Sequence, residues 1–159
     1  MNSKHLYFSS GVIAVLALSA IARSIVPQSS THKPTLKVMG AANVPAHVLA
    51  ALDRACLDCH SNDTRWPWYA RLPFAGEMIG EDVTRARRFM NFSEWTNYST
   101  GQRLAYVTAI GSSSGKTMPP SGYVFAHWSA RLSEQDLQGL RQWARAERVR
   151  LLESRARKR

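Results

Sequence analysis

The chain has 159 residues, a formal net charge of +10 and a hydrophobic content of 45%. That length allows one domain with a buried core, together with extensions at the termini. Its two cysteines lie three positions apart, which excludes a domain held together by several long-range disulfides. We therefore expect the cysteines to serve local chemistry.

An uncharged apolar block, LYFSSGVIAVLALSAIA, runs from Leu6 to Ala22. Its most apolar part has the length of a signal-peptide core, and Ala20 and Ala22 fit a small-x-small cleavage site. Counted from Leu6, the block approaches the roughly 17 to 25 residues that cross a bilayer. Residues 1–25 are therefore predicted to be a signal peptide or a membrane anchor helix. Either reading places the remainder of the chain outside the cytoplasm.

Residues 26–43 are polar and contain two prolines, so they are predicted to be a linker, with ordered structure beginning near Val44. Pro45 suits the first turn of a helix. The apolar stripe that follows predicts a short amphipathic helix ending at the cysteines. The stripe consists of Val48, Leu52, Ala55 and Cys56.

Three further helices are predicted, the first over Gly76–Met90. Each of the other two opens with a capping box, and the earlier of them ends at Gly111, before the loop SSSGKTMPPSG. The capping boxes are Ser99 with Gln102 and Ser133 with Asp136. Because no segment alternates as a strand does, residues 44–148 are predicted to form one all-α domain.

Residues 149–159 are predicted to be a basic tail. From Ala144 to Arg159 there are seven basic and two acidic residues, which supply half of the net charge. Nucleic-acid binding would require aromatic side chains between the basic ones, and Trp143 is the only aromatic residue nearby. We therefore expect a solvated helix end and no nucleic-acid partner. The tail could also attract anionic lipids or an acidic redox partner.

The segment CLDCHSNDTRWPWY, from Cys56 to Tyr69, holds both cysteines. A redox dithiol normally follows a strand and opens a helix, whereas this pair closes a helix. A structural zinc site requires four ligands, and the chain has no second cysteine pair. Neither of these two chemistries suits the segment.

The motif C-x-x-C-H is the attachment site of a c-type haem. Cys56 and Cys59 lie about one helical turn apart, so their sulfur atoms can reach two vinyl groups of one macrocycle. His60, next in the chain, is predicted to be the proximal iron ligand. One such motif predicts one covalent haem c with its iron.

Met118 is predicted to be the second axial ligand, since the prolines after it stiffen the polar loop that carries it. A methionine opposite a histidine raises the reduction potential and suits electron transfer. Met78 and Met90 lie on a predicted helix and are expected to fill the core. His127 is the alternative ligand, although a packing role beside Phe125 and Trp128 is also open.

Three segments resemble the bacterial haem-binding domain family of small c-type cytochromes. They are CLDCHSNDTRWPWY, DVTRARRFMNFSEW and MPPSGYVFAHWSARLSEQDLQGLRQW. The resemblance spans Val44 to Trp143 and implies a cytochrome c-like helical domain with an N-terminal membrane segment. It implies haem attachment by Cys56, Cys59 and His60, and Met118 as distal ligand. The chain departs from the family pattern in having Ala86 in place of glycine and Asp82 in place of a possible histidine.

The residues after His60 are expected to complete the haem site. The aromatic run is predicted to wall the haem and exclude water, which raises its potential. Asn62 and Thr64 are expected to stabilise the turn. The aromatic residues are Trp66, Trp68 and Tyr69. Three arginines could pair with haem propionates or be surface charges: Arg65, Arg71 and Arg87.

These features predict a c-type cytochrome that binds one haem and transfers electrons outside the cytoplasm. It would be anchored in the inner membrane facing the periplasm, or be periplasmic after signal cleavage, and its partners would be redox proteins. No small-molecule substrate is evident, so we expect an electron carrier and not an enzyme. The alternatives are a haem-based redox or gas sensor and a peroxidase-like enzyme with an open sixth iron position.

Overall fold

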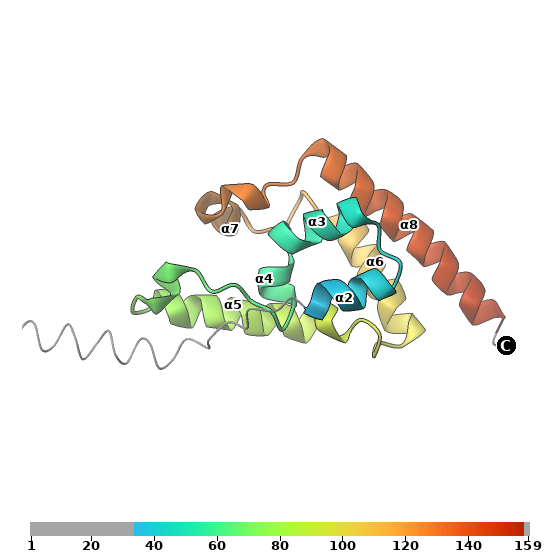
Figure 1. Ribbon diagram of the computed structural model, residues 1–159, viewed down its shortest axis with the longest axis horizontal. Coiled ribbons are helices and arrows are strands. Elements are labelled where there is room, and N and C mark those ends of the chain that lie inside the picture. The colour runs from blue at the N-terminus through green and yellow to red at the C-terminus, as the bar shows by residue number, and fades with distance from the viewer. Residues whose placement is uncertain (1–33, 158–159) are drawn as a thin grey trace, which may run out of the picture.

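The computed structural model describes residues 34–157, which fold into helices without a β-strand (Figure 1). The predicted all-α class is therefore confirmed for this part of the chain. The predicted signal or anchor segment, residues 1–25, lies outside the described residues. Within the described range, no helix is both long enough and apolar enough to cross a bilayer.

The first described helix, α2 (Pro34–Ala41), falls in the segment predicted to be a linker. Its Met39 side chain is fully buried in the core, and Thr35 Oγ1 lies 2.5 Å from Ser93 Oγ. The expectation that order begins near Val44 is therefore wrong. A helix of eight residues is too short to show a clear period in the sequence. Such a short helix is stabilised mainly by packing against the rest of the domain.

The predicted helix before the cysteines is confirmed as α3 (Ala46–Ala55). Pro45 directly precedes it, and Val48 and Leu52 bury the predicted apolar stripe. A single further turn, α4 (Leu57–His60), follows at once. Cys56 is the junction between the two helices, with a φ of −128° that ends α3.

The helix predicted over Gly76–Met90 is confirmed as α5 (Ala75–Phe89). Short 3₁₀ turns flank it, η1 (Trp68–Arg71) before and η2 (Phe92–Glu94) after. Met90 is buried as expected, whereas the Met78 side chain is 63% exposed and does not fill the core.

Helices α6 (Thr100–Ser113) and α8 (Glu134–Ala156) pack against each other, and both predicted capping boxes are present. Gly111 does not end α6. A Cβ built on Gly111 would lie 3.4 Å from Ala144 Cβ, so the glycine allows α6 to approach α8 closely. The predicted basic tail belongs to α8 as far as Ala156, and its Leu151 side chain is buried.

The remaining elements are α7 (Ser121–Ala126) and η3 (Trp128–Ala130), for which no helix was predicted. In Figure 1 α7 lies near the start of α5, at the end of the molecule away from the C-terminus of α8. The loop that carries Met118 leads directly into α7.

The core lies at the other end, among α2, α3, α6, α8 and η2. Phe92 stacks on Trp95 with ring centroids 6.0 Å apart, and Trp95 contacts Trp143 of α8 at 6.2 Å. The core therefore holds rigidly the segment that follows α5. That segment includes Met90, whose carbonyl group contacts the C-x-x-C-H turn.

Candidate functional site

The C-x-x-C-H motif forms one compact turn at the end of α3. The Cys56 amide donates to the Leu52 carbonyl at 2.8 Å, which completes α3. The His60 amide donates to the Cys56 carbonyl at 2.9 Å, and the Cys59 amide contacts the same oxygen at 3.2 Å. Both cysteines are free and partly buried, so the turn presents two thiols and an imidazole within five consecutive residues.

The two thiols do not resemble those of a redox dithiol. Burial, together with the neighbouring Cys59, raises the pKa of the Cys56 thiol to about 12. Burial and the charge of Asp58 raise the pKa of Cys59 to about 11. A reactive dithiol requires a lowered thiol pKa, so these two side chains remain protonated at neutral pH.

The His60 imidazole is held as the tautomer that carries its proton on Nδ1. Its Nδ1 lies 2.9 Å from the Met90 carbonyl oxygen, which can only accept, so Nδ1 carries the proton. Burial lowers the pKa of His60 despite this hydrogen bond, and the neutral ring keeps a lone pair on Nε2. Metal-binding histidines are commonly fixed by such a hydrogen bond from the other ring nitrogen.

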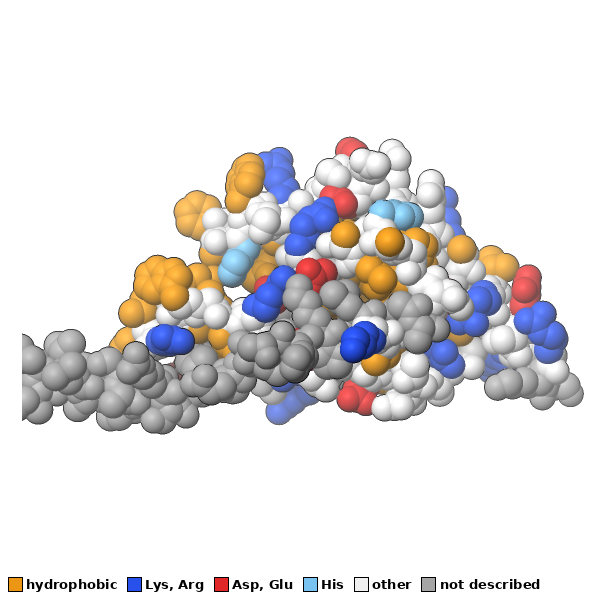
Figure 2. Space-filling model, in the orientation of Figure 1, with side chains coloured by type: hydrophobic (Ala, Val, Ile, Leu, Met, Phe, Trp, Pro, Cys, Tyr) orange, Lys and Arg blue, Asp and Glu red, His pale blue; other side chains and the backbone are white. Residues whose placement is uncertain are grey.

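Apolar side chains are exposed at the end of the molecule where α7 and the start of α5 lie (Figure 2). They project from η1, the start of α5, α7 and η3, where a soluble surface would normally be polar. The residues are Trp68, Leu72, Phe74, Met78, Phe125 and Trp128. A large, mostly apolar macrocycle suits exposed apolar side chains of this kind together with two thiols and an imidazole in one turn, so the residues present fit a haem.

The aromatic run after His60 is divided between two environments. Trp66 and Tyr69 are partly buried, whereas Trp68 is 76% exposed. Trp68 contacts Tyr69 edge to face, with ring centroids 5.8 Å apart. Their role as a haem wall stays a prediction.

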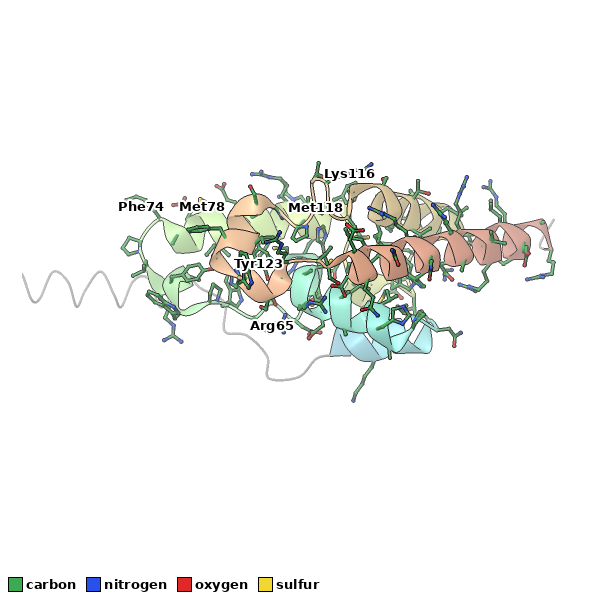
Figure 3. All side chains as sticks on the ribbon, turned by 90° about the horizontal axis from the view of Figure 1, so that it is seen from above. Arg65, Phe74, Met78, Lys116, Met118 and Tyr123 are labelled. Atoms are coloured by element: carbon green, nitrogen blue, oxygen red, sulfur yellow. The ribbon has the colours of Figure 1, made fainter. Side chains whose placement is uncertain are left out.

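Met118 lies in the loop between α6 and α7, and its side chain is 43% exposed. The loop backbone fixes it on both sides: its amide donates to the Ser113 carbonyl at 3.2 Å, and its carbonyl accepts from Gly115 at 2.8 Å. Figure 3 shows Met78 beside Phe74, whereas Met118 lies nearer the middle of the domain; both thioethers are exposed. Exposed Met78 is therefore a second thioether that must be tested beside Met118.

His127 is engaged at both ring nitrogens. Its Nδ1 donates to the Tyr123 carbonyl at 3.1 Å, which leaves Nε2 to accept from the Tyr69 hydroxyl, also at 3.1 Å. Its ring also stacks on Tyr123 with centroids 4.3 Å apart. The structure thus favours the packing role of His127, since iron binding would break the hydrogen bond to Tyr69.

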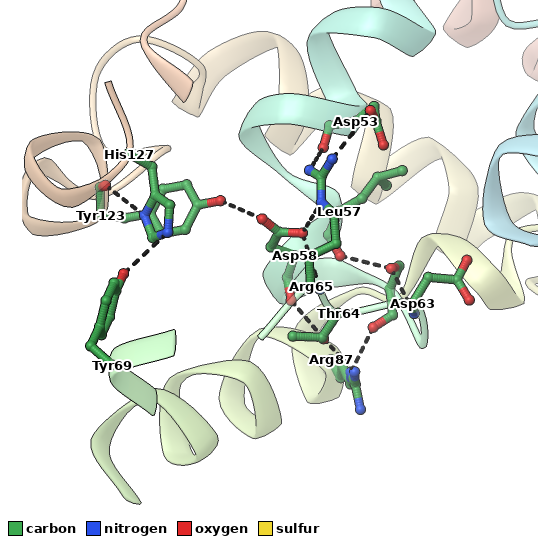
Figure 4. A network of polar contacts seen from close by, with 11 residues as sticks. Asp53, Leu57, Asp58, Asp63, Thr64, Arg65, Tyr69, Arg87, Tyr123 and His127 are labelled. Atoms are coloured by element: carbon green, nitrogen blue, oxygen red, sulfur yellow. Dashed lines mark hydrogen bonds and ion pairs between the residues drawn. The ribbon is translucent and has the colours of Figure 1, made fainter. Parts of the chain in front are cut away.

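Two of the predicted propionate partners brace the turn instead (Figure 4). Arg65 Nε lies 2.8 Å from Asp58 Oδ1, and Arg87 donates from Nε to the Ser61 carbonyl at 2.8 Å. Arg87 Nη2 also donates to Thr64 Oγ1 at 2.7 Å. Both guanidinium groups therefore fix the path of the chain after His60.

The expected roles of Asn62 and Thr64 in the turn are confirmed. Thr64 Oγ1 donates to the Asp58 carbonyl at 2.7 Å, and Asn62 Oδ1 accepts from Asn91 Nδ2 at 2.8 Å. The third predicted arginine, Arg71, is exposed at the end of η1.

Sequence reasoning missed the carboxylate of Asp58 and the hydroxyl of Tyr123, which are 2.8 Å apart. Asp58 lies between the two cysteines, and Tyr123 follows Met118 by five residues. Their positions inside two of the motifs were the available signal. No periodicity connects residues 65 positions apart, so the pairing required the fold.

The family model described as a haem-binding domain matches residues 14–146 of the chain. The chain belongs to this haem-binding domain family. The resemblance found in the sequence is therefore confirmed at the level of the family and of haem as its ligand. No match was found among curated proteins, and none among solved structures.

Proposed function

We propose that this protein is a c-type cytochrome that binds one covalent haem and transfers electrons outside the cytoplasm. The observation that carries the proposal is the His60 side chain. It lies in the same turn as two thiols, and its Nδ1 donates to the Met90 carbonyl, which leaves the lone pair on Nε2. Membership of the haem-binding domain family supports the cofactor.

Each part of the site has a role in this proposal. The Cys56 and Cys59 thiols would each add across one vinyl group, the sulfur bonding to one carbon and the proton passing to the other. His60 and Met118 would supply the two protein ligands of the iron. When bound, the haem iron supplies a one-electron ferrous–ferric couple.

The chain's own contacts favour an electron carrier. The hydrogen bond from His60 to the Met90 carbonyl and the braces from Arg65 and Arg87 fix the attachment turn. A ligand set held in this way needs little rearrangement when the iron changes its charge. We further propose that residues 1–25 direct the domain to the periplasmic side of the inner membrane, where it exchanges electrons with redox proteins.

The test of the ligand set is the optical spectrum of the purified ferric protein, wild type beside Met118→Ala. We expect a long-wavelength Met-to-iron band in the wild type and its loss in the variant. Met78→Leu is the matched control, since this thioether is also exposed and its loss should leave the band unchanged. A spectrum unchanged by Met118→Ala would contradict the assignment of Met118. Loss of the band in Met78→Leu would then assign Met78, and a wild type without the band would point to His127.

A haem-based sensor or a peroxidase-like enzyme is the second candidate function. The observation that favours it is the 43% exposure of the Met118 side chain. Rapid binding of carbon monoxide to the ferrous protein, or turnover of peroxide, would support this candidate. A ferrous protein that excludes carbon monoxide would support the electron carrier.

A further inference from the structure

We propose that Tyr123 is a positioning residue, which holds the Met118 loop closed over the haem attachment turn through a hydrogen bond to Asp58. The inference rests on the proposed function, because it concerns the distal side of the same site. It adds a residue pair whose role is to set how often Met118 leaves the iron.

The contact joins the two halves of the site directly. The Tyr123 hydroxyl donates to Asp58 Oδ2 at 2.8 Å, as the dashed line in Figure 4 shows. Asp58 lies in α4 between Cys56 and Cys59, so it moves with the attachment turn. Tyr123 lies in α7, five residues after Met118, and moves with the distal loop.

The acceptor in this contact is itself fixed. Arg65 Nε donates to Asp58 Oδ1 at 2.8 Å, and the Arg65 amide contacts the same oxygen at 3.3 Å. Asp58 therefore presents its other oxygen in one direction. Burial and the charge of Asp58 raise the pKa of Tyr123 far above its ordinary value, so the hydroxyl stays protonated and remains a donor.

The hydrogen bond matters because α7 has little other support. Among the described helices, α7 packs only against η3. The side chains of Phe125 in α7 and Trp128 in η3 are exposed and do not anchor this segment in the core. Besides the bond from Tyr69 to His127, the contact between Tyr123 and Asp58 is the polar link from this segment to the site.

The link from Tyr123 to Met118 is short and stiff. Two prolines, Pro119 and Pro120, separate Met118 from α7, and proline restricts the backbone to a narrow range of φ. The Val124 amide donates to the Pro120 carbonyl at 3.0 Å, which joins the prolines to the helix. Release of Tyr123 from Asp58 would therefore let α7 move, and the two prolines would pass this movement to Met118.

The test is an imidazole titration of the ferric holoprotein, which measures how readily an external ligand replaces Met118. Imidazole binds only when the loop is open, so its apparent affinity rises with the open fraction. Loss of a hydrogen bond to a carboxylate predicts that Tyr123→Phe binds imidazole about tenfold more tightly than the wild type. Tyr106→Phe is the control: it removes a phenol hydroxyl from α6, where the ring contacts Tyr98 and Phe89, and should leave the affinity unchanged.

Unfolding of Tyr123→Phe and Tyr106→Phe in denaturant distinguishes a general loss of stability from a specific opening of the Met118 loop. A tighter imidazole affinity in Tyr123→Phe alone, at equal loss of stability in the two variants, supports the positioning role. In an Asp58→Ala background, Tyr123→Phe should have no further effect on imidazole affinity. A further tenfold change there would contradict the pairing with Asp58.

The titration also distinguishes this inference from the proposed function. A wild type with the Met-to-iron band and an unchanged imidazole affinity in Tyr123→Phe overturns the role of Tyr123 and leaves the cytochrome assignment intact. A wild type without that band overturns Met118 as ligand, and the role of Tyr123 falls with it. Because Tyr123→Phe removes one oxygen atom, the comparison does not depend on Asp58→Ala reaching the folded, haem-loaded state.

Discussion

At the scale of single residues, the site depends on side chains that hold the backbone of the attachment turn. The imidazole of His60 is directed by a backbone carbonyl, that of Met90, which no substitution removes directly. The turn after His60 instead relies on Arg87, whose guanidinium reaches both the Ser61 carbonyl and Thr64 Oγ1. Sequence alone left Arg87 as either a propionate partner or a surface charge, because a basic side chain near a haem motif has the right charge for both.

Arg87→Ala tests this brace. The loss of two hydrogen bonds from a charged donor predicts a fall of about 2 kcal/mol in the free energy of unfolding. Arg85→Ala is the control on the same helix, since its contact with Asp82 is a 3.8 Å pair between exposed side chains and should contribute little. Denaturant unfolding of the two holoproteins checks the difference. Equal stabilities would show that the Arg87 contacts do not hold the turn.

At the scale of elements, the Met118 loop requires a glycine at one position. Gly115 has a φ of +75°, and a Cβ there would meet Leu137 Cδ2 at 2.7 Å. Both the left-handed conformation and the contact with α8 disfavour any larger residue. The Gly115 amide also donates to the Met118 carbonyl, so strain at Gly115 would be passed to the predicted ligand.

Gly115→Ala should therefore lower the free energy of unfolding by about 1 to 2 kcal/mol and weaken the Met-to-iron band. Gly122→Ala is the matched control, because a Cβ on Gly122 in α7 meets nothing within 4 Å. That variant should be neutral or slightly stabilising, as alanine favours helix. Thermal unfolding followed at the band and in the far ultraviolet would reveal both effects. A neutral Gly115→Ala would contradict the strained geometry.

The helices that could be predicted from sequence are those with local signals. The capping boxes at Ser99 and Ser133 and the apolar stripe of α3 depend on neighbours within a few residues. Helices α2 and α7 are too short to show a period and exist because distant contacts hold them. The same reason explains the site: the C-x-x-C-H motif is local, whereas the pairs that fix it join residues far apart in the sequence.

At the scale of the whole molecule, the core reaches as far as the C-x-x-C-H turn, where Leu57 belongs to the core cluster and Cys56 packs against it. The core includes α2, which the sequence placed in a linker, and Met39 is fully buried there. The Thr35 amide also donates to Asp63 Oδ2 at 2.9 Å, which ties α2 to the turn after His60. The domain that supports the site therefore begins before Val44.

Met39→Ala tests this boundary. Truncation of a buried methionine predicts a loss of about 2 to 5 kcal/mol in the free energy of unfolding. Met78→Ala, whose side chain is 63% exposed, should cost much less and is the matched control. Denaturant titrations of the two variants give the comparison. Equal effects would mean that α2 does not contribute to the core.

The central claim is that Cys56, Cys59 and His60 form a covalent haem site, and intact mass after denaturation tests it most directly. Protein produced in a cell that attaches c-type haem should keep the mass of one haem per chain under denaturing conditions. The double variant Cys56→Ala with Cys59→Ala should keep none. A wild-type chain that releases its haem on denaturation, or a double variant that retains it, would contradict the assignment.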